Sequence, residues 1–309
     1  MRIGTSLVES QGPQALAHLH DEIRTAADDG FSSVWMAHIF GLDALTALAV
    51  AGRGIDGIEI GTAVVPTYPR HPAVLAQQAL TAALALGGRL VLGIGLSHKI
   101  VIEDMYGYSF DAPAVHMDEY LSILLPLLSG QPASFEGTTM RAGIGLSVPR
   151  DADVPVMLAA MGPRMLRLAG QRTAGTILWM TGPATTRDYI VPTINEAAQK
   201  ARKPPPRVVC ILPVCVTDDP DGARGRAAKV FEIYGQLPSY RAMLDREGAQ
   251  GPADVAIVGS EDEVAAQIAA LADAGVTDFV AGEFAAGDDR RRTRALLKTL
   301  TAQAEETGR

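Results

Sequence analysis

The segment Ile58-Glu-Ile-Gly-Thr-Ala-Val-Val-Pro-Thr-Tyr-Pro-Arg-His-Pro72 begins as a buried-looking strand and ends at a proline. Pro72 suits the first turn of a helix over residues 73–86, because the N–H that proline lacks has no partner there anyway. The intervening polar loop carries Thr67, Tyr68, Arg70 and His71. A rigid strand that leads into such a loop is how an α/β protein builds one wall of a ligand site, although an ordinary strand–loop–helix connection has the same pattern.

The same pattern recurs along the chain and predicts a (β/α)₈ TIM barrel. Each expected strand is a short, nearly continuous apolar run followed by a helical segment, which is typical of a closed parallel barrel rather than an open sheet. The 309 residues suit one such barrel, so we expect a single domain over residues 1–309. The expected strands are residues 2–7, 31–37, 58–65, 89–94, 154–160, 175–180, 207–216 and 278–281.

Two segments exceed a minimal barrel. Residues 129–153 are predicted to form a hairpin before the fifth strand, and residues 218–259 add helices after the seventh strand, the first of them over residues 222–234. Long connections of this kind usually shape the catalytic face of a barrel.

The composition argues against a nucleic-acid partner and against a disulfide. The net charge of −8 and the pI near 5.3 argue against nucleic-acid binding, so an anionic ligand needs a local positive site. The two cysteines, Cys210 and Cys215, lie five residues apart on one expected strand and point to opposite faces, so they cannot pair. Free thiols, no signal peptide and no membrane-spanning apolar run predict a soluble cytoplasmic protein.

The carboxyl ends of the strands predict where the site lies, because TIM-barrel active sites form there. His38 and His98 are candidate acid/base residues, since imidazole titrates near neutral pH. His18, His20 and His116 fall on helices and are predicted to be ordinary surface or packing residues, and no cluster has metal-ligand spacing. Other residues at the strand ends are Ser6, Glu9, Ala37, Phe40, Ala63, Val64, Thr67, Ser97, Met161 and Trp179 to Gly182.

Met161-Gly-Pro-Arg-Met165 is the best candidate for binding an anion. Gly162 permits close approach of the backbone, Pro163 can open a helix, and the free N–H groups with the helix dipole favour a phosphate. Arg164 adds a charged, fork-shaped donor, although a plain turn with a surface arginine is the alternative. Gly93-Ile-Gly-Leu-Ser-His98 only partly matches a dinucleotide-binding loop, because the third glycine is absent.

Five segments resemble the luciferase-like flavin and deazaflavin oxidoreductase family, and within it the actinobacterial enzymes that use coenzyme F420. They are residues 31–38, 60–65, 89–95, 160–163 and 175–179. The resemblance implies a barrel that binds the deazaflavin in its mouth for hydride transfer, and a homodimer. It also implies a non-prolyl cis peptide bond at Ala63–Val64, where a bulge supports the ring, and a role for His38 in acid/base chemistry or in orienting the substrate.

On this basis we expect the coenzyme to contact Ala63, Val64, Thr67, Ser97, Met161, Gly162, Pro163 and Arg164. The residues expected in the substrate pocket are Phe40, Tyr68, Tyr106, Trp179 and Met180, with Met36 and Met105 nearby. A pocket of this composition fits an apolar substrate with one polar reactive group. The family's sugar-phosphate branch has acidic residues where this chain has Ala37 and His98, so oxidation of a sugar phosphate is not expected.

The sequence therefore predicts an F420-dependent oxidoreductase acting on an activated C=C, C=N or C=O bond, or on the corresponding alcohol. Two alternatives stay open, an FMN-dependent monooxygenase on the same barrel and a non-catalytic deazaflavin-binding protein. A sugar-phosphate isomerase or aldolase is disfavoured, because no lysine other than Lys99 falls near a strand end.

Overall fold

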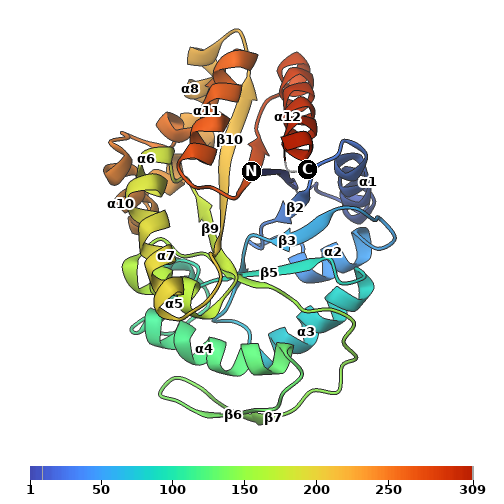
Figure 1. Cartoon of the computed structure of the whole chain (residues 1–309), viewed down its shortest axis with the longest axis vertical. Coiled ribbons are helices and arrows are strands. Elements are labelled where there is room, and N and C mark those ends of the chain that lie inside the picture. The colour runs from blue at the N-terminus through green and yellow to red at the C-terminus, as the bar shows by residue number, and fades with distance from the viewer. Residues whose placement is uncertain (9, 308–309) are drawn as a thin grey trace.

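Eight parallel strands close into a barrel in the computed structural model, which describes residues 1–8 and 10–307 (Figure 1). The ring is closed by pairing of the last strand with the first and of the sixth with the seventh. The predicted TIM barrel and its eight strands are confirmed. The strands are β1 (Arg2–Ser6), β2 (Ser33–Met36), β3 (Glu59–Thr62) with its continuation β4 (Val65–Pro66), β5 (Leu90–Gly95), β8 (Val156–Leu158), β9 (Gly175–Trp179), β10 (Arg207–Val216) and β12 (Asp278–Glu283).

Helices surround the strands, and several begin at the predicted residues. Asp43 accepts a hydrogen bond from the Thr46 N–H at 2.9 Å, and Pro72 occupies the first turn of its helix. A further helical segment begins at Pro183, and the polar C-terminal helix was not predicted, because few apolar residues mark its buried face. The helices are α1 (Ala15–Asp28), α2 (Ala44–Ala51), α3 (Pro72–Ala85), η1 (Val101–Met105), α4 (Pro113–Leu128), α5 (Pro163–Arg172), α6 (Pro183–Thr185), η2 (Thr186–Ile190), α7 (Val191–Lys200), α11 (Glu261–Asp273) and α12 (Gly287–Thr307).

The first insertion is the predicted hairpin, formed by β6 (Ala133–Glu136) and β7 (Arg141–Ile144). Its turn is held by the buried Glu119 carboxylate, which accepts the backbone N–H groups of Thr138 at 2.6 Å and Thr139 at 2.7 Å. Burial alone raises the pKa of Glu119, but these hydrogen bonds outweigh it and lower the pKa to about 2. The carboxylate therefore stays charged and fixes the hairpin to α4.

The second insertion contains α8 (Pro220–Val230), α9 (Glu232–Gln236), α10 (Pro238–Glu247), η3 (Pro252–Val255) and a short strand, β11 (Ile257–Gly259), that pairs with β10. The prediction of one continuous helix over residues 222–234 is wrong. The chain leaves helical geometry at Phe231, whose ring packs against Trp179 at the end of β9. A long-range aromatic contact thus accompanies the break between α8 and α9.

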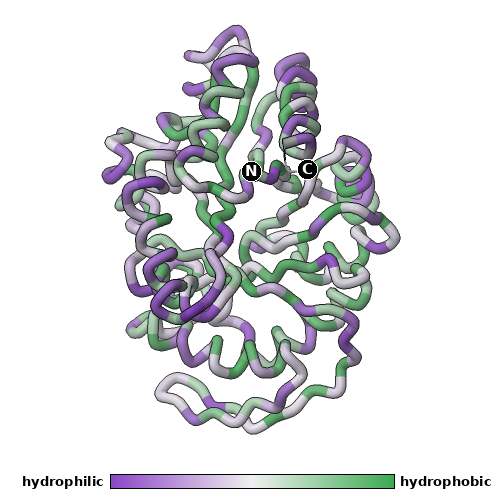
Figure 2. Tube along the Cα trace, viewed as in Figure 1, coloured by the Kyte–Doolittle hydropathy of each residue, from purple (hydrophilic) through white to green (hydrophobic). Residues whose placement is uncertain are grey.

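Hydrophobic clusters inside the barrel and between the strands and the helices hold the barrel together. Much of the chain along the strands is coloured as hydrophobic in Figure 2. Trp35 fills the interior beneath Gly61, where any Cβ would overlap the indole ring. Cys210 and Cys215 are buried and unpaired, as predicted. Within residues 1–8 and 10–307, none of the helices combines the length and the apolar character needed to span a membrane.

Ion pairs cross the barrel at its amino end. Arg207 opens β10 and bonds Glu59 at the start of β3 and Asp278 at the start of β12, both at 2.7 Å. Burial lowers the pKa of Arg207, but the hydrogen bonds that it donates to both carboxylates raise the pKa well above its ordinary value. Arg2 reaches Asp278 at 3.2 Å from the more exposed side. This network closes the bottom of the barrel and leaves the carboxyl ends of the strands as its mouth.

We predict that Arg207→Ala lowers the free energy of unfolding by about 3–5 kcal/mol, because the buried Asp278 charge then keeps the more exposed Arg2 as its remaining ion-pair partner among the described residues. Arg2→Ala is the matched control, since the Arg2 side chain is 40% exposed. Exposed partners of this kind contribute about 1 kcal/mol or less. Urea denaturation followed by circular dichroism measures both values. Equal losses for the two variants contradict a cross-barrel role for Arg207.

Candidate active site

A bulge interrupts the third barrel strand at the mouth. β3 pairs with β5 up to Gly61, and β4 resumes the pairing at Val65. The Ala63–Val64 peptide bond between them is cis, as the resemblance implied. The buried Thr62 hydroxyl bridges the gap, since it donates to the Gly93 carbonyl at 2.8 Å and accepts from the Gly93 N–H at 2.9 Å. One side chain thus satisfies two backbone groups that the bulge leaves without strand partners.

The glycines of β5 allow this close approach. A Cβ at Gly93 would overlap the carbonyl oxygen of Thr62, and one at Gly95 would collide with the Val64 side chain. Both glycines lie within the strand and pack against the bulge. The glycine pattern that partly matched a dinucleotide loop is therefore explained by strand packing.

The bulge and the end of β9 form an apolar floor across the mouth. Ala63, Val64 and Trp179 pack on top of the hydrophobic cluster that fills the barrel. The Trp179 Nε1–H is buried and, within the described part of the chain, has no hydrogen-bond partner. A buried donor left unpaired costs about 1–3 kcal/mol. A ligand that brings an acceptor to this indole removes that cost.

An aromatic wall, defined as Trp179, Phe231, Tyr234 and Tyr240, rises from this floor. The Trp179 ring meets Phe231 and Tyr234 edge-on, with centroids at 5.7 and 5.6 Å. Tyr234 meets Tyr240 in the same way at 5.4 Å. Three of the four rings come from the second insertion and were missed from the sequence. The available signal was three aromatic residues within ten positions of a long connection at the catalytic face.

His98 stands at the end of this wall, just after β5. The preceding Ser97 has φ of +63°, a conformation uncommon for a residue other than glycine. Among the described residues the His98 ring nitrogens have no hydrogen-bond partner, and the ring contacts Tyr240. Burial lowers the pKa of His98 below its ordinary value. A neutral imidazole is therefore available to a ligand at neutral pH.

His38, after β2, is engaged by other protein groups. Its Nδ1 accepts the Ala44 N–H at 3.1 Å, and its Nε2 lies 3.3 Å from the Arg70 guanidinium. Arg70 in turn pairs with Asp43 at 2.5 Å, which also caps α2. This network fixes the orientation of the His38 ring. Both ring nitrogens of His38 thus face protein donors, unlike those of His98.

Tyr68 lies on a second stack beside the bulge. Its ring is parallel to that of His116, with centroids 3.9 Å apart, and the Thr67 hydroxyl lies 3.1 Å from His116 Nε2. Burial lowers the pKa of His116 to about 4, so the ring is neutral. His116 is the packing residue that was predicted. Thr67 is fully buried, and its hydroxyl is engaged with His116.

The other predicted residues are spread around the mouth. Met180 is fully buried in the outer core, behind the wall, because the chain turns there with φ of +53°. Phe40 and Tyr106 are exposed, at 63% and 41%. Met161 is half-buried beside Thr181, whose hydroxyl lies 3.7 Å from its sulfur. Glu9 lies outside the described residues.

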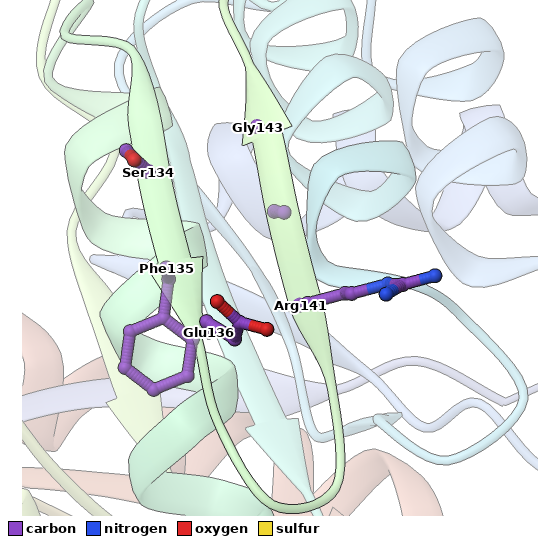
Figure 3. Close-up of a pocket in the computed structure, with 6 residues that line it drawn as sticks. Ser134, Phe135, Glu136, Arg141 and Gly143 are labelled. Carbon is purple, nitrogen blue, oxygen red and sulfur yellow. The ribbon is translucent and has the colours of Figure 1, made fainter.

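Gly162, Pro163 and Arg164 form the exposed start of α5 at the rim of the mouth. Arg164 and Arg167 line an open pocket of about 590 Å³ between α4, α5 and the hairpin. A second open pocket, of about 530 Å³, lies on the hairpin itself, where Glu136 lies between the strands and the Arg141 guanidinium points away from it (Figure 3). Arg164 thus lies on the outer side of the barrel rim, between the helices and the hairpin.

Comparison with known proteins identifies the family whose model matches this chain and proteins of similar sequence. The family model described as luciferase-like monooxygenase matches residues 1–278. A 5,10-methylenetetrahydromethanopterin reductase of Methanolobus tindarius is 27% identical over 91% of this chain and 94% of its own length. A putative coenzyme F420-dependent oxidoreductase of Mycobacterium tuberculosis is 29% identical over 76% of this chain and 72% of its own.

Two solved structures share the fold. The coenzyme F420 dependent tetrahydromethanopterin reductase from Methanopyrus kandleri superposes with a TM-score of 0.79 at 22% identity, covering 98% of this chain and 99% of that one. The monooxygenase RslO1 from Streptomyces bottropensis gives 0.80 at 20% identity, covering 99% and 100%. At these identities the likeness establishes the barrel and not the reaction.

We predict that Thr62→Val lowers the free energy of unfolding by about 2–6 kcal/mol. The change conserves volume but leaves the buried N–H and carbonyl of Gly93 unpaired, at about 1–3 kcal/mol for each group. Thr62→Ser keeps the hydroxyl and is the matched control, with an expected loss of about 1 kcal/mol from the missing methyl group. Chemical denaturation measures both. If Thr62→Val and Thr62→Ser lower the free energy of unfolding by the same amount, the hydroxyl bridge does not hold the bulge.

Proposed function

The chain belongs to the luciferase-like monooxygenase family, and from this premise we propose that it is an oxidoreductase that uses the deazaflavin coenzyme F420. Its substrate is a small, largely apolar molecule with an activated C=C, C=N or C=O bond, or the corresponding alcohol. The observation that carries the proposal is the apolar floor of Ala63, Val64 and Trp179, with one buried, unpaired indole N–H and a neutral imidazole nearby.

The residues at the mouth fit the coenzyme and the substrate. Ala63 and Val64 offer an apolar support for a ring system, and the partly exposed Ser97 and Met161 follow neighbouring barrel strands. The Trp179 N–H can donate to the one polar atom of an otherwise apolar substrate. When bound, the coenzyme supplies hydride chemistry, which is its own rather than the protein's.

The protein's part in the reaction is to exclude water, orient the substrate and move a proton. The aromatic wall places apolar ring surface against Trp179 of the floor, which disfavours water there. A ring nitrogen of neutral His98 takes the proton of a substrate hydroxyl in the oxidative direction, and the imidazolium returns it in the reductive direction. His38, fixed by Ala44 and Arg70, orients the substrate.

The charged extension of the coenzyme is assigned to the start of α5. This helix has Gly162 before Pro163 and no side-chain cap, so its first N–H groups remain available to an anion. Arg164 is exposed beside them, and it has no ion pair within the described chain. The protein's net charge of −8 does not attract an anion, so this local positive site supplies the attraction for the coenzyme's charged extension.

An FMN-dependent monooxygenase is the second candidate. It is favoured by the similarity to RslO1, a monooxygenase whose TM-score of 0.80 matches that of the F420-dependent reductase. Both candidates place a planar ring on the same floor, so the choice of coenzyme separates them.

We predict saturable quenching of coenzyme fluorescence when the protein is titrated with F420. The expected Kd is about 1 µM or below, roughly −8 kcal/mol, with FMN bound at least about tenfold more weakly. Oxygen consumption with reduced FMN is the companion measurement. Tighter binding of FMN, together with oxygen consumption, replaces the deazaflavin proposal with the monooxygenase. Tight F420 binding with no turnover across a broad panel of alcohols and carbonyl compounds indicates a carrier.

We predict that His98→Gln lowers turnover by about 10²-fold, as expected for loss of general acid/base help, with little change in coenzyme affinity. Since burial lowers the pKa of His98, kcat/KM for oxidation should rise with pH only below about 6.5 and stay flat above it. His98→Gln should remove that limb of the profile. His38→Gln is the comparison, expected to raise KM more than it lowers kcat. An unchanged profile in His98→Gln removes this residue from the proton transfer.

We predict that Arg164→Ala weakens F420 binding by about one to two decades, through loss of a charge-assisted hydrogen bond of roughly 1.5–3 kcal/mol. Arg167→Ala, one turn further along α5, should have a smaller effect. A truncated deazaflavin without the phosphate-bearing extension should bind the variant and the wild type equally. Equal weakening for full and truncated coenzymes moves the phosphate site to another loop.

A further inference from the structure

The orientation of the His98 imidazole needs an explanation. A catalytic histidine is usually oriented by a hydrogen bond to one ring nitrogen, which also fixes its tautomer. Within residues 1–8 and 10–307 neither ring nitrogen of His98 has such a partner. Among aromatic rings of the described chain, His98 contacts Tyr240, at a centroid distance of 5.5 Å and an interplanar angle of 54°. Packing, rather than hydrogen bonding, therefore orients this ring.

Tyr240 is itself firmly held. It lies in the first turn of α10, where its N–H donates to the Leu237 carbonyl at 3.0 Å. Its ring meets Tyr234 at 85°, and Tyr234 meets Trp179 at 77°. The aromatic wall thus forms a series of edge-to-face contacts from Trp179 to Tyr240, which meets His98 in a tilted contact. Such contacts contribute about 0.5–1.5 kcal/mol each beyond area burial and restrict ring rotation.

We propose that Tyr240, supplied by the second insertion, is the residue that positions the His98 imidazole for proton transfer. The role rests on the proposed function, because it matters for catalysis only where His98 exchanges a proton. Tyr240 is a positioning residue and touches neither the proton nor the hydride. The insertion after β10 thereby completes the catalytic site, in addition to covering it.

The surrounding charges are consistent with a purely steric and desolvating contact. Burial lowers the pKa of His98. Burial also raises the pKa of the Tyr240 phenol, and the neighbouring Tyr234 adds a smaller increase. Both phenols therefore stay neutral at working pH. The nearby charged groups on the β5–η1 side, Lys99 and Glu103, pair with each other at 3.6 Å. Removal of the Tyr240 ring should admit water to His98 without adding or removing a charge.

The test follows the C–H resonances of His98 by NMR in the coenzyme-free protein, with His98→Gln used to assign them. In Tyr240→Ala the His98 pKa should rise toward its ordinary value. In Tyr240→Phe, which keeps the ring, it should stay at the wild-type value. With substrate and coenzyme, Tyr240→Ala should lower kcat about tenfold and leave KM within twofold. It should also shift the acidic limb of the pH profile to higher pH. Tyr240→Phe should keep the wild-type kcat and pH profile.

Tyr240→Leu serves as a second variant that keeps apolar bulk but no aromatic ring, in case alanine unfolds the insertion. The inference is overturned if His98 titrates alike in wild type, Tyr240→Leu and Tyr240→Ala, or if Tyr240→Phe perturbs the titration as much as they do. The NMR titration needs no turnover. If the His98 pKa shifts in the variants but neither the wild type nor any variant shows turnover, the result contradicts the proposed function and leaves the positioning contact intact.

Discussion

The hydroxyl of Thr62, bonded to both backbone groups of Gly93, is the interaction on which the candidate site depends. It lets the third strand bulge away from β5 without leaving buried polar groups unpaired. The bulge carries Ala63 and Val64 over the packed interior, where they become the floor of the mouth. Glycine at position 93 is the complementary requirement, because a side chain there would overlap the Thr62 carbonyl.

The two ends of the barrel have opposite roles. At the amino end, Arg207 joins carboxylates from two other strands and closes the interior. At the carboxyl end the floor is apolar, and the second insertion places an aromatic wall above it. The amino end of the barrel is thus charged, whereas its mouth is apolar. An apolar mouth suits a planar hydrophobic ring system, and the Trp179 N–H is the polar side-chain group of the floor.

The barrel could be predicted from the sequence because its signals are local. Each apolar run forms a strand, and Asp43 and Pro72 mark helix starts through contacts within one turn. What could not be predicted depends on contacts between distant segments. The break at Phe231 faces a ring on β9, and Thr67 turns inward to bond His116 on α4. The strand-end rule identified His98, but only the folded chain distinguishes its free ring nitrogens from the bonded ones of His38.

The central claim is that the bulge at Ala63–Val64 and the end of β9 form the support for a deazaflavin ring. A crystal structure of the protein with F420 tests this most directly. The account predicts the ring against Ala63 and Val64 in the barrel mouth, with its phosphate-bearing extension running toward the start of α5. A ring bound elsewhere, such as the pocket between α5 and the hairpin that Arg167 lines, with the mouth left empty, would contradict it.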